Sequence, residues 1–173
     1  FLVPFDVGGY CKCTTCKPLL DIGRGRAATD FNTGESSDYV FSFVNAVAKE
    51  VATTHPDKFI GTLAYEGYYW TPRSFKMEQN VTVSPCVHPK FWANCPETYA
   101  KNEFTHYKNW VKLAKGGKMG PMGMWNYDFD IPGSPTSYYA HERGEYVKMF
   151  LKDGVRHVFH CGAPAMLEMH VTN

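Results

Sequence analysis

Short apolar runs and amphipathic helical patterns alternate along this chain, and the alternation constrains its fold more than any other feature. Strands are expected at 1–5, 59–65, 80–84, 118–127 and 155–160, and helices at about 38–54, 97–115 and 137–153. Strands that alternate with helices form crossover units and a mainly parallel sheet. The sequence therefore predicts an α/β fold, a partial (β/α) barrel with about five mainly parallel strands and three helices.

The length of 173 residues predicts a single domain over 1–173, long enough to bury a core. A complete eight-unit barrel needs about 250 residues. We therefore expect the carboxyl-terminal part of a barrel, and the first residue, Phe1 rather than Met, favours a processed or partial chain. A sheet with two open edges can pair with other chains, which makes a homo-oligomer or filament an expected alternative to a closed monomer.

Composition narrows the expected ligands. Aromatic residues make up 16% of the chain, which favours either a heavy core or surfaces that stack on flat ligands such as sugar rings. The net charge is +1 and no basic cluster stands out, so nucleic acid is not an expected partner. No apolar run is long enough to span a membrane, and no membrane partner is expected.

Polar or reactive residues stand where the expected strands end. In parallel sheets, ligands bind at the carboxyl ends of the strands, so these residues define a candidate site. They are Asp6, Glu66, Cys86, His88, Asp128, His160 and Cys161.

Two carboxyl groups on either side of a bond are the usual requirement for glycoside hydrolysis. Glu66 lies among tyrosines, where reduced solvation raises a carboxyl pKa and suits the general acid/base role. Asp128 or Asp6 is then the partner. The alternatives remain open: Glu66 can simply meet solvent, Asp6 can stabilise the turn that follows it, and Asp128 can cap a loop.

Aromatic side chains beside these strand ends are candidates for stacking on a sugar substrate. A tryptophan next to a strand can equally belong to the core, and the sequence does not separate the two roles. The candidates are Tyr65, Trp70, Trp92, Trp125 and Tyr127.

The six cysteines allow two interpretations. Cys11, Cys13 and Cys16 can supply three thiolates to a structural zinc ion, which needs a fourth ligand such as Cys161, His160 or His88. An even number of cysteines in a secreted chain favours disulfides instead, and Cys86 with Cys95 is a plausible pair. No cofactor is required for the expected function, and a structural zinc ion is possible.

Several motifs, taken in order, resemble a family of secreted bacterial proteins labelled only as a domain of unknown function, assigned to the glycoside-hydrolase barrel superfamily. The matching segments are Asp6-Val-Gly-Gly-Tyr-Cys11-x-Cys13-x-x-Cys16, Ser37-Asp-Tyr-Val-Phe-Ser-Phe-Val-Asn45, Pro56-Asp57-Lys58, Leu63-Ala-Tyr65, Pro72, Asn80-Val81, Cys86, Cys95-Pro96, Trp110 and Trp125-Asn-Tyr127. The resemblance implies a secreted, carbohydrate-related barrel. The amino-terminal part of that family has no counterpart in this sequence.

Two functions follow as hypotheses. The first is a glycoside hydrolase, or a fragment of one, that acts on extracellular polysaccharide through Glu66 and an aspartate. The second is a non-catalytic secreted protein on a degenerate barrel, which binds glycan or assembles through its sheet edges.

Overall fold

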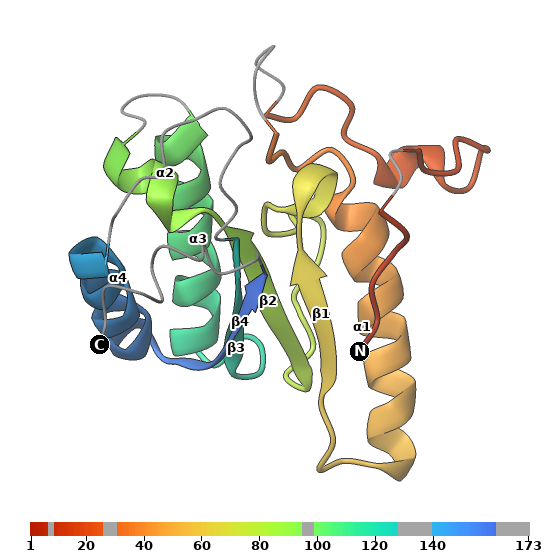
Figure 1. Cartoon of the computed structure of the whole chain (residues 1–173). Helices are drawn as coiled ribbons and strands as arrows, with labels where there is room; N and C mark the ends of the chain where they lie inside the picture. Colours follow the sequence, from red (N-terminus) through yellow and green to blue (C-terminus); the bar gives the residue numbers. More distant parts are fainter. Residues whose placement is uncertain (7–8, 26–30, 95–98, 128–139, 162–173) are drawn as a thin grey trace.

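A computed structural model describes residues 1–6, 9–25, 31–94, 99–127 and 140–161. Its centre is a four-stranded parallel sheet in the order β1-β2-β3-β4 (Figure 1). The strands are β1 (Ile60–Ala64), β2 (Val81–Val87), β3 (Met122–Tyr127) and β4 (Val155–Cys161). The predicted α/β class is confirmed, and within the described residues the sheet is open, with β1 and β4 at its edges.

The helices match the expected pattern. They are α1 (Ser37–Thr54), α3 (Tyr99–Lys115) and α4 (Ala140–Asp153), with a short additional helix α2 (Pro89–Asn94). In α1, Val40, Phe41, Val44 and Ala48 are buried, and their spacing puts them on one helical face. That single apolar face explains why this segment lies against the sheet.

Helices α1, α3 and α4 cover the same face of the sheet. Phe41 of α1 lies 5.0 Å from Trp110 of α3, ring centroid to ring centroid. Trp110 is fully buried and donates from Nε1 to the backbone oxygen of Tyr69 at 2.7 Å. Phe150 of α4 packs on Tyr107 of α3 at 5.7 Å, so α4 continues the same layer. The core therefore lies between the sheet and its helices.

The opposite face of the sheet carries a different set of side chains. A Cβ atom on Gly123 of β3 would lie 2.3 Å from Ser84 Oγ of β2 and 2.1 Å from His157 Nε2 of β4. These three neighbouring strands thus present residues to one face, on which Trp125 packs against Phe159 at 4.2 Å. Consecutive parallel strands with helices on one face form an arc, as in part of a β/α barrel.

The expected strand at 1–5 is not formed. The segment runs beside β1, where Leu2 N donates to Gly61 O at 2.7 Å, but residues 1–5 have no strand conformation. Pro4 has no N–H to extend a ladder, which limits this segment to isolated contacts. Its effect is to bring Asp6 toward the carboxyl end of β1.

Candidate functional site

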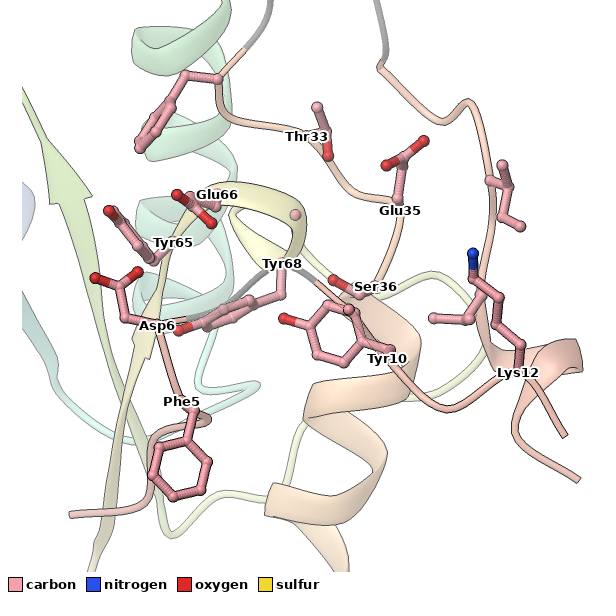
Figure 2. Close-up of a pocket in the computed structure, with 15 residues that line it drawn as sticks. Phe5, Asp6, Tyr10, Lys12, Thr33, Glu35, Ser36, Tyr65, Glu66 and Tyr68 are labelled. Atoms are coloured by element: carbon pink, nitrogen blue, oxygen red, sulfur yellow. The ribbon is translucent and has the colours of Figure 1, made fainter.

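A pocket of about 550 Å³ opens beside the carboxyl end of β1. Figure 2 shows Asp6, Tyr65 and Glu66 gathered on one side of it, with Glu35 and Lys12 on the other. The sequence predicted Asp6 and Glu66 as strand-end residues, and both line this pocket although sixty positions separate them. Aromatic side chains form much of the remaining wall: Tyr10, Phe31 and Tyr68.

The backbone at Glu66 is strained. Tyr65 follows the last residue of β1, and Glu66 begins a short 3-10 helix, η2 (Glu66–Tyr68), with φ of 44°. A non-glycine residue in this left-handed region costs about 1–2 kcal/mol, and such residues cluster at functional sites. The left-handed conformation of Glu66 turns the chain sharply as it leaves the sheet.

Backbone hydrogen bonds hold this turn in place. Thr33 N donates to Glu66 O at 2.8 Å, and Ser36 N donates to Gly67 O at 2.8 Å. The approach is close at Gly67, where a Cβ atom would lie 2.9 Å from Ser36 Oγ. The segment 33–36 therefore fixes the position of Glu66 from across the pocket.

The pKa of Glu66 is raised above its ordinary value. Burial is the largest cause, and the negative charge of Asp6 is the second; a hydrogen bond from Tyr65 partly opposes them. The same surroundings raise the pKa of Tyr65 to about 12, mainly through burial and then through Glu66 and Asp6. A carboxyl group of this kind keeps its proton at a higher pH than usual, as a general acid requires.

Aromatic rings from the ends of three strands meet next to the carboxyl groups. Tyr65, after β1, lies 6.1 Å from Tyr127 at the end of β3, between ring centroids. His88, after β2, stacks on Tyr127 at 4.9 Å and 17°. Phe31 meets the ring of Tyr65 edge-on at 5.5 Å. Tyr65 and Tyr127 were both predicted as binding residues, and the structure brings them together.

Glu103 was not predicted from the sequence as a site residue, yet its carboxylate binds His88 after β2, Trp92 of α2 and Asn32. Its side chain is fully buried and accepts four hydrogen bonds. The donors are His88 N (2.7 Å) and Trp92 Nε1 (2.8 Å) to Oε1, and Asn32 Nδ2 (2.9 Å) and His88 Nδ1 (2.9 Å) to Oε2. The available signal was its position four and seven residues before Tyr107 and Trp110, on the apolar stripe of α3.

The tryptophans predicted to contact substrate are distributed differently. Trp92 packs among aromatic rings between the helices, at 5.1 Å from Phe104 and 5.4 Å from Tyr146, and does not line the pocket. Trp70 also lies outside the lining and stacks on His106 at 3.8 Å. Trp125 packs on Phe159, on the face of the sheet opposite the helices.

The cysteines of the amino-terminal motif lie together. The Sγ atoms of Cys11, Cys13 and Cys16 are all within 4.8 Å of one another, and their thiols are free. Cys86 is buried with a free thiol, and burial raises its pKa. Its predicted partner Cys95 lies outside the described residues, as does Asp128, so these predictions stay open.

The chain belongs to the family described as a domain of unknown function (DUF4838), whose model matches residues 2–170. Neither the curated proteins nor the solved structures gave a match to the chain. Among the described residues, no helix has the length and apolar character needed to cross a membrane.

Proposed function

We propose that the pocket at the end of β1 is the active site of a glycoside hydrolase that acts on extracellular polysaccharide. One observation carries the proposal: Asp6 and Glu66 line the same pocket, and the charge of Asp6 helps to raise the pKa of Glu66. Pairs of carboxyl groups with different affinities for protons are the usual machinery of glycosidic cleavage. The resemblance to secreted glycoside-hydrolase barrels supports the extracytoplasmic location.

In this mechanism Glu66 is the general acid and Asp6 is the second carboxyl group. Glu66 donates its proton to the glycosidic oxygen as the bond from that oxygen to the anomeric carbon breaks. Exposed Asp6 either attacks the anomeric carbon or takes a proton from the water that does so. If Asp6 has attacked, water breaks the bond between Asp6 and the anomeric carbon, and Glu66 takes the proton of that water. If Asp6 has taken the proton of water, Asp6 releases it to solvent and Glu66 takes up a proton from solvent. In both cases water supplies the new hydroxyl of the released sugar.

The walls of the pocket suit a carbohydrate. Tyr10 and Phe31 offer ring faces or edges on which the apolar side of a pyranose can lie. Thr33 and Glu35 on the opposite wall offer oxygen atoms for sugar hydroxyls. Pockets of about 300–1,000 Å³ hold small ligands, and this one falls within that range.

The test is release of reducing ends from a panel of polysaccharides and oligosaccharides by the purified chain, detected by mass spectrometry. Glu66→Gln is expected to lower kcat by about 100- to 10,000-fold, the usual contribution of a general acid. Asp6→Asn is expected to lower it as well, while Glu50→Gln, on the exposed surface of α1, leaves it unchanged. Equal activity in Glu66→Gln and the parent would refute the assignment.

The edge strand β4 favours a second function, which is non-catalytic glycan binding or self-assembly. Phe159 is 51% exposed and Val158 is 38% exposed on this strand, so apolar groups of both faces meet solvent. Such a strand can pair with another chain, or its aromatics can hold a glycan without cleaving it. Tight glycan binding without release of reducing ends, or a concentration-dependent assembly seen by light scattering, would favour this non-catalytic alternative.

A further inference from the structure

We propose that Cys11, Cys13 and Cys16 form a zinc site with three thiolate ligands. These side chains have no part in the cleavage chemistry proposed above, and the proposal stands independently of that reaction. The first support is their separation: each Sγ lies within 4.8 Å of the other two. A group of three sulfurs is a typical soft-metal ligand set.

The sulfur separations are close to those of a tetrahedral zinc site. A Zn–S bond of about 2.3 Å places two sulfurs of a tetrahedron about 3.8 Å apart, so closure from 4.8 Å needs a movement of about 1 Å. Cys11 and Cys13 are exposed and Cys16 is half-buried, so an ion can reach the site from solvent. Small side-chain rotations suffice to bring the sulfurs to bonding distance.

The backbone around the cysteines is ordered by local hydrogen bonds. Lys17 N donates to Cys13 O at 2.9 Å, and Leu19 N donates to Cys16 O at 3.0 Å. A 3-10 helix, η1 (Lys17–Leu19), follows directly. The turn thus holds Cys13 and Cys16 in place before any metal arrives, which lowers the entropy cost of binding.

Charge and proton balance are consistent with zinc. Three thiols release three protons as they bind one Zn²⁺ ion, and the resulting group carries a charge of minus one. Lys12 and Lys17 are exposed neighbours in the sequence and offset part of that charge. In the part of the chain that the structure describes, the cluster has three ligands, so solvent takes the fourth position in this proposal.

The site lies next to the wall of the pocket. Tyr10 and Lys12 line the pocket and alternate with the ligands Cys11 and Cys13 along the chain. Tyr10 also packs on Tyr39 of α1, with 5.1 Å between the ring centroids. A bound zinc ion would therefore fix this part of the pocket wall beside α1.

The experiment measures zinc bound to the reduced, purified chain by elemental analysis and by competition with a chromophoric chelator. We expect about one zinc ion per chain, and binding of Co²⁺ with the thiolate-to-cobalt absorption of a tetrahedral site. Cys13→Ser and Cys16→Ser should each weaken zinc binding by more than about 100-fold, beyond the loss typical of an outer-shell partner. Cys161→Ser is the matched control and should bind zinc like the parent.

Circular dichroism of each variant separates loss of the site from loss of the fold. Cys13 is exposed, so its serine variant is expected to keep the parent spectrum. No zinc bound by the folded, reduced parent would overturn the proposal. So would retention of parent affinity in Cys13→Ser, or a Cys13–Cys16 disulfide that persists in the chain isolated under reducing conditions.

Discussion

Glu103 gives the sharpest stability prediction. Its carboxylate is fully buried, and each oxygen accepts two hydrogen bonds, from Asn32, Trp92 and twice from His88. Glu103→Gln keeps the shape of the side chain but turns one oxygen into an NH₂ group. Whichever oxygen is replaced, two buried donors then face a donor instead of an acceptor.

The magnitude follows from those two donors. A buried donor without a partner costs about 1–3 kcal/mol. At the middle of that range, about 2 kcal/mol, one such donor costs about 2 and two cost about 4 kcal/mol, so Glu103→Gln should lose about 2–4 kcal/mol of unfolding free energy. A shift of the His88 ring proton from Nδ1 to Nε2 can restore one bond, and this sets the lower end. Glu103→Ala leaves all the donors without that carboxylate and should lose about 3–5 kcal/mol.

Urea denaturation followed by tryptophan fluorescence measures the loss, since Trp92 is one of the donors. With a slope of about 2 kcal/mol per molar urea, Glu103→Gln should lower the midpoint by about 1–2 M. Glu50→Gln, exposed on α1, is the control and should change stability by less than about 0.5 kcal/mol. A Glu103→Gln loss no larger than this control would refute the assigned network.

Three further outcomes are expected. Glu66→Gly should abolish glycan cleavage yet stabilise the fold by about 0.5–1 kcal/mol, because glycine accepts φ of 44° without strain. Thermal melts that show a destabilised variant would contradict this prediction. Asp6→Asn should lower the pKa of Glu66 in a carbon-detected NMR titration, and an unmoved titration would mean that the two groups are not coupled. Burial, and then the charge of Arg24, lower the pKa of His106 to about 4 from 6.5. Neutral His106 thus contributes stability above pH 6.5 that is lost as the pH falls toward 4, on the order of 1–2 kcal/mol after solvent screening. In denaturation experiments the His106→Gln variant should not show this loss of stability at low pH. The control variant His55→Gln, at an exposed position after α1, should show the same loss as the parent.

Local sequence patterns were sufficient for much of the fold. The stripe of Val40, Val44 and Ala48 in α1, and the alternating valines of β2, depend on near neighbours. The first formed within the helix predicted at 38–54, and β2 began within the predicted strand 80–84 but extends to Val87. The expected strand at 1–5 failed because strand pairing is a long-range property. Its apolar residues satisfied the pattern, but Leu2 alone joins β1 by a backbone hydrogen bond in that segment.

The candidate site was predictable only in part. The rule that parallel strands present their carboxyl ends together places Glu66 at the pocket, and the turn after residue 5 brings Asp6 there. The Glu103 network joins Asn32 to a residue 71 positions away, and no local pattern contains that contact. Trp92 was a candidate for substrate binding, but α2 turns it toward α3 and Glu103, a direction set by tertiary packing.

The most direct test of the central claim is hydrolysis in water enriched in heavy oxygen, with the products read by mass spectrometry. If Glu66 and Asp6 cleave a glycosidic bond, the parent should release sugars that carry one heavy oxygen at the anomeric carbon. Glu66→Gln should release at least about 100-fold less of this product. Labelled product formed equally by the parent and Glu66→Gln, or no product from any glycan that the chain binds, would contradict the account.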